Sequence, residues 1–433
     1  MHLMKISIFW FRRDLRIEDN TAFHHALASE FAVLPIFIFD QNILTELSKD
    51  DSRVSFIHST LQSIHKKLVE RGSSLLCMKG NPEEIWNELI KKYEIVKVFV
   101  NKDYEPFALE RDKKITSLLN KNGIDIITFK DQVVFEENEI VKDDGKPYTI
   151  FTPYKKKWLE HFHRKPLLNN TKSNFHNLYP VNLSFPSLSE IGFTKSKINV
   201  RDFDLSHLDD YAEKRNTPSE NTTYLGPHLR FGTVSIRKII SQINFSQEVF
   251  LSELIWREFF MQILFHFPTV IDQNFKSQYN NIQWKNNEKD FEKWCQGKTG
   301  YPLVDAGMHQ LNNTGFMHNR VRMLVASFLC KHLLIDWRWG EAYFAENLLD
   351  YELSSNNGNW QWAAGTGCDA ASYFRIFNPM SQLIKFDKDL KYVKKWIPEF
   401  EQSEYIKPIV EHNFARQRAL DTYKIGLRTK LNY

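Results

Sequence analysis

The chain has 433 residues, of which 42% are hydrophobic, 25% charged and 14% aromatic, and its formal net charge is +4. These values describe a soluble globular protein that is too long for one ordinary core, so we expect two domains. The mildly basic balance is compatible with nucleic-acid binding but does not indicate it, because many metabolic enzymes share it.

The N-terminal stretch MHLMKISIFWFRRDLR reaches charged side chains too early for a secretory signal, and no apolar run has the length of a membrane span. The four cysteines are scattered and form no CxxC pair, which argues against a zinc site or a disulfide framework. We therefore expect a cytoplasmic protein with no membrane partner and no metal.

Residues 1–130 alternate short apolar runs with amphipathic stretches. ISIFWF, VLPIFIFD, SLLCMKG, VKVFVNKD and DIITF are typical of buried strands, and the segments between them are typical of helices. This alternation predicts an α/β domain with a Rossmann-like parallel sheet. Asp40, Gly80 and Asn101 end strands, where open parallel sheets bind ligands. The sequence contains no GxGxxG or Walker motif, which disfavours a conventional dinucleotide or nucleoside triphosphate site.

The alternation of apolar runs and amphipathic stretches ends after this domain. Residues 131–204 are rich in Pro, Asn and Ser, which predicts a long ordered linker. In residues 205–433, stretches such as EVFLSELIWREFFMQILFHF carry apolar side chains all round, as buried helices of a large bundle do. The sequence thus predicts an α/β domain, a linker and an all-helical C-terminal domain.

Two polar groups of the helical half could serve a ligand. In NTTYLGPHLRFG, hydroxyls and backbone N–H groups precede a helix, which suits a phosphate, although a plain capped turn is favoured from these residues alone. In SELIWREFF, the residues Glu253, Trp256, Arg257 and Phe260 share one helix face. That face is either an internal ion pair with packing or the wall of a cavity, and the helix alone leaves this open.

Two further groups lie nearer the C-terminus. Arg322 shares a helix face with Asn319 and Met323, and a buried guanidinium needs Asp350, Glu352 or a ligand as its partner. In NNGNWQWAAGTG, we expect the preceding helix to end at Asn356 and a loop to follow, because Asn and Gly break helices. Its combination of glycines, indoles and an amide indicates a cofactor pocket more than simple packing.

Five segments together resemble the cryptochrome/photolyase family, and more closely the class I photolyases that repair cyclobutane pyrimidine dimers. They are WFRRDLRIEDN, SELIWREFF, GKTGYPLVDAGMHQLNNTGFMHNRVRM, DWRWGEAYF and NNGNWQWAAGTGCDAASYFRIFNP, in this order over nearly the whole chain. The resemblance implies an N-terminal antenna domain and a helical domain that holds FAD, active in its reduced form. It also implies light-driven repair of UV-damaged DNA by a monomer.

The resemblance implies a role for each matching residue around the flavin. Asn356 would face the flavin N5 and favour the reduced forms, where plant-type cryptochromes carry Asp and animal ones Cys. Trp360, Trp337 and Trp284 match the three-tryptophan chain that carries an electron from the surface. The residues that match FAD contacts are Tyr211, Thr222, Thr223, Leu225, Gly226, Phe250, Asn319, Arg322, Asp350, Glu352 and Asn356.

The dimer pocket implied by the resemblance consists of Glu253, Trp256, Asn319, Met323 and Trp362. Two indoles would sandwich the flipped-out dimer, and Glu253 would hydrogen-bond it while charge develops. DNA contacts near the lesion, mostly through phosphates, would come from Arg215, Arg257, Arg320, Arg375 and Gln382.

The sequence departs from the family pattern at Gly226 (commonly Ser), Phe250 (Trp), Glu352 (Asp), Cys368 (Thr) and Ser372 (Pro). None of these changes removes a group that the chemistry needs. The antenna chromophore stays open between methenyltetrahydrofolate, deazaflavin and none, although Glu105 lies where folate-binding members often carry an acid.

Two alternatives remain beside light-driven repair. One is a cryptochrome-like blue-light photoreceptor that signals through a protein partner, which Asn356, Glu253 and the Trp256–Trp362 pair disfavour. The other is a ligand-binding α/β protein without photochemistry, which the three matching tryptophans disfavour. A repair enzyme for six-four photoproducts would carry a histidine pair where this chain has Trp256 and Met323.

Overall fold

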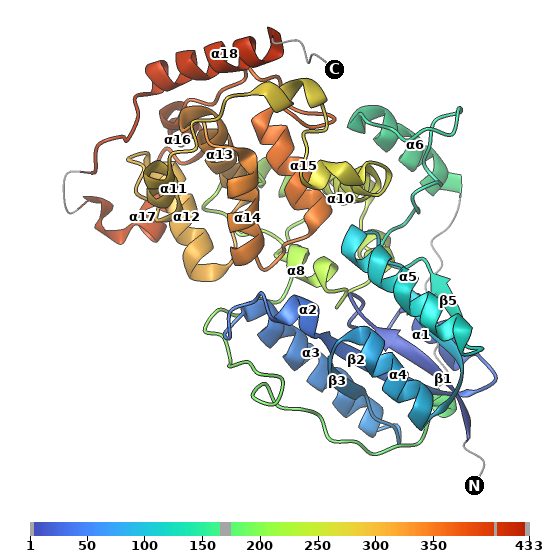
Figure 1. The fold of residues 1–433 in the computed structure, drawn as a ribbon. Helices are drawn as coiled ribbons and strands as arrows, with labels where there is room; N and C mark the ends of the chain where they lie inside the picture. The colour runs from blue at the N-terminus through green and yellow to red at the C-terminus, as the bar shows by residue number, and fades with distance from the viewer. Residues whose placement is uncertain (1–3, 165–174, 402–404, 429–433) are drawn as a thin grey trace. The chain divides into compact units, whose positions relative to one another are not determined.

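The computed structural model describes residues 4–164, 175–401 and 405–428 (Figure 1). The chain divides into two compact units. The first comprises Met1–Glu139, Trp158–Asp202 and Leu225–Asn244, and the second comprises Ile140–Lys157, Phe203–Tyr224 and Phe245–Tyr433. This division differs from the predicted boundaries, because most of the expected linker and a short stretch of the expected helical domain cluster with the sheet.

The first unit is built on a five-stranded sheet in the order β3-β2-β1-β4-β5. All neighbouring strands pair in parallel, which confirms the predicted α/β architecture. The order reverses direction between β1 and β4, and open sheets bind ligands outside the carboxyl ends of their strands at such a point. The strands are β1 (Lys5–Phe11), β2 (Ala32–Asp40), β3 (Leu76–Gly80), β4 (Glu94–Asn101) and β5 (Asp125–Phe129).

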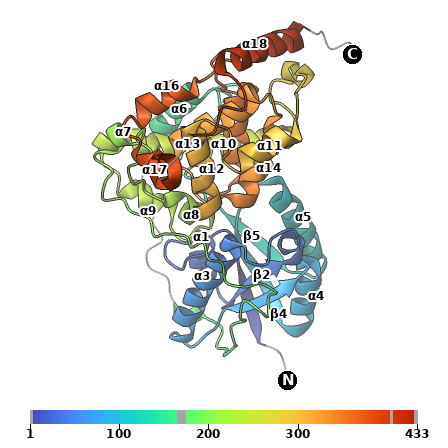
Figure 2. The ribbon, with the colours of Figure 1, turned by 90° about the vertical axis from the view of Figure 1, so that its left-hand side faces the viewer.

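Both faces of this sheet are buried, which explains why its strands are continuously apolar. On β1, the side chains of Ile8 and Trp10 join the core under α4 (Pro82–Lys92) and α5 (Pro106–Lys121). The alternate side chains, Phe9 and Phe11, join the core under α1 (Thr21–Leu27) and α3 (Ser52–Val69). Figure 2 shows α3 on one side of the sheet and α4 with α5 on the other. A single turn, α2 (Gln41–Leu44), follows β2.

The expected linker contributes to this unit because its apolar residues have a core to join. Tyr179 donates its backbone N–H to the carbonyl of Val33 at 2.8 Å, just after the short helix η1 (Phe175–Asn177). Ile191 and Phe193 are buried in the cluster that α1 and α3 cover. A Pro-rich composition therefore marks an ordered, packed segment here.

Residues 225–244 join the first unit through buried charges. Arg237, on α9 (Ile236–Ser241), donates from Nη2 to Oδ1 of Asp131 at 2.9 Å and pairs with Asp19 at 3.1 Å. Arg16 donates to the other carboxylate oxygen of Asp131 at 2.6 Å. These side chains are at most 9% exposed, so this segment is anchored by an ion network as well as by packing.

The second unit is helical, as predicted. The helix α6 (Phe151–Arg164) begins in this unit, and its later turns cluster with the first. The other α-helices are α7 (Tyr211–Lys214), α10 (Glu248–His266), α11 (Glu288–Cys295), α12 (Pro302–Thr314), α13 (Asn319–Ser327), α14 (Trp337–Asn347), α15 (Leu353–Ala364), α16 (Pro379–Phe386), α17 (Lys391–Trp396) and α18 (His412–Arg428). A π-helical turn follows α13 at Phe328–His332, and short 3₁₀ turns lie at Phe245–Gln247, Pro268–Ile271, Ser277–Asn281 and Pro398–Glu401.

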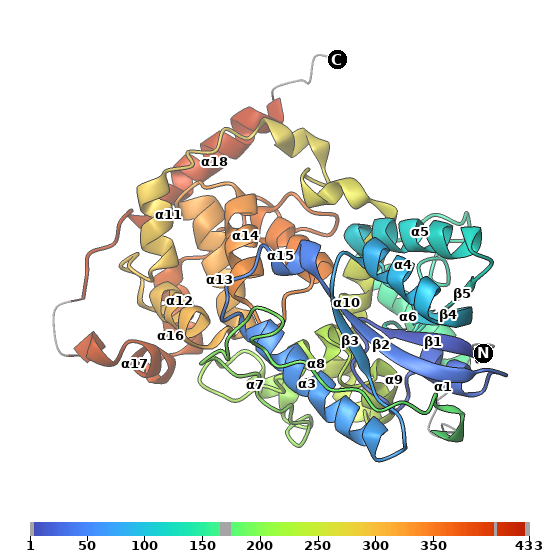
Figure 3. The same cartoon turned by 60° about the horizontal axis from the view of Figure 1, so that its bottom comes forward.

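Helices α13, α14 and α15 lie side by side at the centre of this unit (Figures 1 and 3). The expected loop at Asn356 is therefore wrong: residues 353–364 form α15, and Gly365 ends it in the left-handed conformation. Gly358 is required inside this helix, because a Cβ there would lie 2.2 Å from Cδ1 of Phe260 on α10. Close packing of two helices thus overrides the weak helix propensity of Asn and Gly.

Within the part of the chain that the structure describes, no helix combines the length and the apolar character that a membrane span requires. The same residues hold no group of three or more His, Cys, Asp or Glu side chains placed to bind a metal.

Candidate active site

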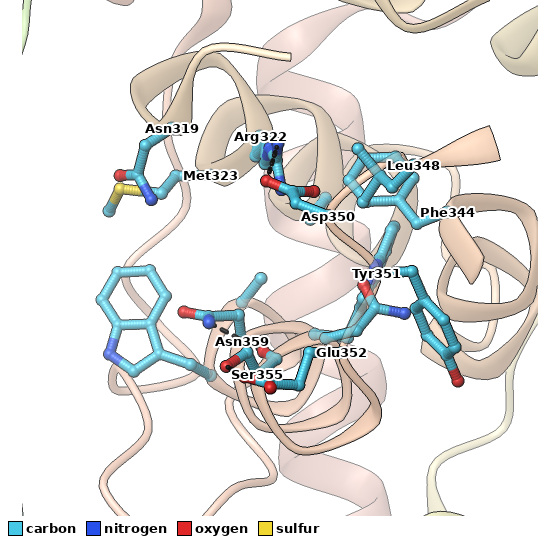
Figure 4. Close-up of a pocket in the computed structure, with 15 residues that line it drawn as sticks. Asn319, Arg322, Met323, Phe344, Leu348, Asp350, Tyr351, Glu352, Ser355 and Asn359 are labelled. Atoms are coloured by element: carbon cyan, nitrogen blue, oxygen red, sulfur yellow. Dashed lines mark hydrogen bonds and ion pairs between the residues drawn. The ribbon is translucent and has the colours of Figure 1, made fainter. Parts of the chain in front are cut away.

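A cavity opens among α13, α14 and α15 in the helical unit. Its empty space, mouth included, is about 620 Å³. Figure 4 shows Asn319, Met323 and Arg322 on one side of this space, with Ser355 and Asn359 of α15 on the other. The cavity is lined by many of the predicted residues, namely Asn319, Arg322, Met323, Asp350, Glu352, Asn356, Trp360 and Trp362.

Arg322 is held by protein groups at the edge of this cavity. It donates from Nη1 and Nη2 to the two carboxylate oxygens of Asp350, at 3.1 and 2.9 Å, and from Nε to the carbonyl of Met317 at 2.7 Å. A two-pronged pair of this kind fixes a guanidinium in direction as well as in place. Of the partners that the sequence left open, the structure thus selects Asp350.

Glu352 has a different partner. Its carboxylate accepts from Nη2 of Arg257 on α10 at 3.0 Å, and the two side chains are only 5% and 13% exposed. The pair ties α10 to the start of α15, and Glu352 forms part of the cavity wall. Arg257, which the resemblance assigns to DNA, therefore already has a buried carboxylate partner.

Asn356 lines the cavity from the first half of α15. Its amide nitrogen donates to the backbone carbonyl of Glu341 at 3.0 Å and to Oε1 of the same residue at 2.8 Å. A backbone carbonyl only accepts, so the nitrogen must face Glu341. Both amide hydrogens are then used, and the amide oxygen is the group that a ligand can meet. Burial raises the pKa of the Glu341 carboxyl, although the hydrogen bond from Asn356 acts in the opposite direction.

The three tryptophans of the predicted electron chain belong to one hydrophobic core of the helical unit. Trp360 and Trp337 are buried there, and Trp284 packs against it half-buried. Trp360 fits because α14 carries Gly340, where a Cβ would lie 2.1 Å from Cη2 of the indole. The sequence did not single out Trp294, which is fully buried and meets Trp360 edge-on at 6.2 Å between ring centroids.

Two residues predicted to contact the substrate, Glu253 and Trp256, lie on α10 and are not among the residues that line the cavity. Glu253 accepts from Nη1 of Arg215 at 2.6 Å, and both side chains are about one-third exposed or less. Burial raises the pKa of Glu253, and the charge of Arg215 partly offsets this. Trp256, one turn further along α10, is half-buried. Tyr211 and Phe250 meet edge-on at 5.1 Å near the same end of α10.

The remaining predicted DNA contacts include a basic group. Burial and the neighbouring charges of Arg215 and Arg375 lower the pKa of Arg320, so the three guanidinium groups are close enough to repel one another. Arg375 lies over the ring of Trp362 at 6.0 Å. Gln382 is on α16 and half-buried. Repulsion of this kind is relieved when phosphates bind.

The predicted phosphate loop is divided between the units. In the second unit, Thr222 has a buried hydroxyl with no hydrogen-bond partner among the described residues. Thr223 accepts from the N–H of Asp204 through its carbonyl at 3.0 Å. Leu225 and Gly226 begin α8 (Leu225–Arg230), which clusters with the first unit.

The sequence missed several lining residues, including Ser355 and Asn359. Ser355 lies at helical spacing from Glu352, the residue just before α15, and Asn359 lies at helical spacing from Asn356 on this helix. The sequence contains this spacing of polar residues, but the spacing indicates a shared face only if the stretch is treated as a helix. The other missed lining residues are Ala326, Phe344, Leu348, Tyr351 and Ala363.

The first unit has a cavity of its own, with an empty space of about 980 Å³. It lies outside the carboxyl ends of β1 and β2 and is lined by Phe11, Phe39 and Asp40 among others. Glu105 lines it as well, and its carboxylate pairs with Arg13 at 2.9 Å and Arg230 at 3.1 Å.

Comparison with known proteins finds a family match for each of the two units. The family described as DNA photolyase matches residues 7–172, and the FAD binding domain of DNA photolyase matches residues 250–404. The chain is 34% identical to the deoxyribodipyrimidine photo-lyase of Synechococcus sp. over 95% of each chain.

Solved structures give the same result. The chain resembles a bacterial class III photolyase from Agrobacterium tumefaciens, with a TM-score of 0.86, 32% identity and 98% coverage of each chain. It also resembles an archaeal photolyase from Sulfolobus tokodaii with two FAD molecules, with a TM-score of 0.85 and 34% identity over 98% of this chain and 100% of that one. A Synechocystis cryptochrome has the same TM-score of 0.85 at 25% identity, over 98% of this chain and 100% of its own. From its sequence and its fold, the chain belongs to the DNA photolyase family.

Proposed function

We propose that the protein is a light-driven lyase that splits cyclobutane pyrimidine dimers in DNA. The observation that carries this proposal is the cavity itself, whose lining combines fixed polar groups for a cofactor with an indole. Arg322, Asp350 and Asn356 are the polar groups, and Trp362 is the indole.

The residues present fit FAD. The hydroxyl of Thr222, which has no hydrogen-bond partner among the residues that the structure describes, suits a phosphate oxygen. The amide oxygen of Asn356, whose nitrogen donates to Glu341, suits a protonated ring nitrogen. When bound in its reduced form, FAD would supply the light-driven electron transfer that cyclobutane ring opening needs. The protein residues hold the cofactor and the lesion in fixed orientations and keep water out.

The substrate would be held by residues of α10, α13 and α15. Trp362 and Trp256 offer aromatic faces to the two flipped-out bases. Glu253, whose carboxylate Arg215 holds at 2.6 Å, would hydrogen-bond the dimer while charge develops on it. The basic group of Arg215, Arg320 and Arg375 would bind the phosphates on either side.

The direct test uses the chemically reduced protein and an oligonucleotide that carries one thymine dimer. Restoration of the intact bases under light, and not in the dark, is followed by chromatography. That result would establish the lyase. Intact dimers after illumination of protein with bound, photoreducible flavin would instead support the cryptochrome-like photoreceptor, whose fold a Synechocystis cryptochrome shares.

Replacing Trp362 with alanine should weaken binding of dimer-containing DNA. Loss of one base–aromatic stack costs about 1–3 kcal/mol, or about 5- to 150-fold in affinity. Flavin content should stay the same, because the polar groups assigned to the flavin are all retained. Titration of a fluorescent oligonucleotide measures the affinity. Trp362→Phe keeps a ring, so its affinity should lie between those of the parent protein and the alanine variant. Equal affinity of the alanine variant would remove Trp362 from the dimer pocket.

Replacing Glu341 with leucine should lower the reduction potential of the bound FAD. The change removes one of the two acceptors that orient the Asn356 amide, so the amide oxygen is presented less often to the reduced ring. A lost hydrogen bond of about 0.5–1.5 kcal/mol corresponds to about 10–30 mV for a two-electron couple. Spectroelectrochemistry measures the shift. Glu341→Gln keeps an acceptor and should retain the parent potential, and an equal shift in both variants would contradict this role.

We infer that the cavity of the first unit holds an antenna chromophore. Its empty space of about 980 Å³ lies where parallel sheets bind ligands, and its largely apolar lining suits a flat ring system. Adding methenyltetrahydrofolate, a deazaflavin or extra FAD to the purified protein should identify it through energy transfer to the catalytic flavin. No binding of any of the three would contradict an antenna at this cavity.

We also infer a cytoplasmic monomer that acts on DNA. Light scattering during gel filtration should give a mass near 51.4 kDa without DNA, and a value near twice this would contradict the monomer.

A further inference from the structure

Trp256 packs against Phe151, a residue that we expected in the linker from the sequence. The rings of Phe151 and Trp256 are stacked, with centroids 3.6 Å apart and planes inclined by 9°. Phe151 is 7% exposed, whereas Trp256 is half-buried. One face of the indole is therefore covered from inside the protein. The exposed part of the same side chain is what a base can reach.

The edges of this indole are confined as well. Phe259 meets Trp256 edge-on at 5.5 Å, and Phe260 lies tilted at 5.4 Å. Phe260 is in turn held by the close approach of α15 at Gly358. With one face and its edges in contact with neighbours, the indole has little freedom to rotate.

Phe151 is itself held by the segment that follows Trp362. Its backbone N–H donates to Oδ2 of Asp369 at 3.0 Å, in the loop after α15. Tyr154, one turn later, packs on Phe259 at 5.2 Å, and Lys155 pairs with Glu248 of α10 at 2.9 Å. The first turn of α6 is thus joined both to the helix that carries Trp256 and to the loop after the helix that carries Trp362.

We propose that Phe151 is a positioning residue for lesion recognition, which sets the angle between the Trp256 and Trp362 indoles before DNA binds. This inference rests on the proposed function. A flipped-out dimer presents two bases at a fixed angle, because the cyclobutane ring joins them. Two indoles held at the matching angle lose less entropy on binding than two mobile ones. Undamaged bases do not have this shape, so the arrangement favours the dimer over ordinary DNA.

The test compares the affinity for an oligonucleotide with one thymine dimer and for the same oligonucleotide without it. Phe151→Leu keeps an apolar side chain but removes the stack. Aromatic pairs contribute an amount that corresponds to about 2- to 12-fold in affinity. We expect dimer affinity to fall by this factor, with unchanged flavin content and unchanged affinity for intact DNA. Phe151→Tyr keeps the ring and should restore the preference for dimer DNA.

A matched control is available in the first unit. Phe135, like Phe151, is buried and packs on a tryptophan, with Trp158 edge-on at 5.3 Å. Phe135→Leu should leave both affinities unchanged. If Phe151→Leu does not fold, Asp369→Ala removes the acceptor that holds Phe151 and should lower the dimer preference in the same direction.

Each outcome decides the inference. An unchanged dimer preference in Phe151→Leu overturns it, and so does an equal loss for both DNAs, which would mean general loosening. A parent protein that does not prefer dimer DNA would overturn the proposed function itself, whatever Phe151 does.

Discussion

Replacing Trp337 with phenylalanine is expected to slow light-driven reduction of oxidised, protein-bound FAD by at least about 100-fold, or ~2.7 kcal/mol of barrier. Trp337 is fully buried in the core that contains Trp360, and its indole donates to Oδ1 of Asn274 at 2.9 Å. A phenyl ring keeps the packing but is far harder to oxidise than an indole. Flavin absorbance under steady illumination with an external reductant measures the rate. Repair by chemically reduced protein should stay at the parent level.

Trp294 provides a matched control for this experiment. It is also fully buried, its indole donates to the carbonyl of Val325 at 3.2 Å, and its ring contacts Trp360. Both variants lose one indole hydrogen bond, so their losses of stability should be similar. Trp294→Phe should photoreduce at the parent rate. A block in Trp294→Phe, with normal photoreduction in Trp337→Phe, would mean that the electron travels through Trp294 instead.

Replacing Asp131 with asparagine is expected to destabilise the first unit by about 3–5 kcal/mol, because two buried guanidinium groups lose their shared counter-charge. Arg16 and Arg237 both donate to this carboxylate. The free energy of unfolding in urea at pH 7 measures the loss. Asp210→Asn is the control, because Asp210 and its partner Lys214 are both about half exposed. Such surface pairs contribute about 0–1 kcal/mol, so a similar loss in both variants would contradict the assigned role of burial.

The same carboxylate predicts a pH dependence. Burial disfavours the charged form of Asp131, but the charges of Arg16 and Arg237 outweigh it and lower its pKa. A lowered folded-state pKa contributes stability that is fully present above the unfolded pKa of about 3.9 and is lost as pH falls through the folded value. Asp14 is also buried and has a raised pKa, so it contributes with the opposite sign. The difference between the parent and Asp131→Asn isolates Asp131, and it should shrink only below about pH 4.

Much of the site followed from residue types and their order. The strand and helix alternation of the first domain was predictable, because buried parallel strands must be apolar on both faces. The long motifs also identified Asn319, Arg322, Met323 and Asn356 without any coordinates. The structure places all four in one cavity. The apolar alternation and the motifs are both local information, since each depends on a residue and its near neighbours in the chain.

What the sequence by itself determined about this protein is therefore its fold class and its family, and it also named eight of the residues that line the cavity. Only the tertiary structure decided that residues 353–364 form a helix, that Arg322 pairs with Asp350 while Arg257 takes Glu352, and that Phe151 backs Trp256. The physical reason is common to all three. Helix propensity and charge are properties of single residues, whereas close helix packing, ion-pair choice and ring stacking depend on groups far apart in the chain that folding brings together.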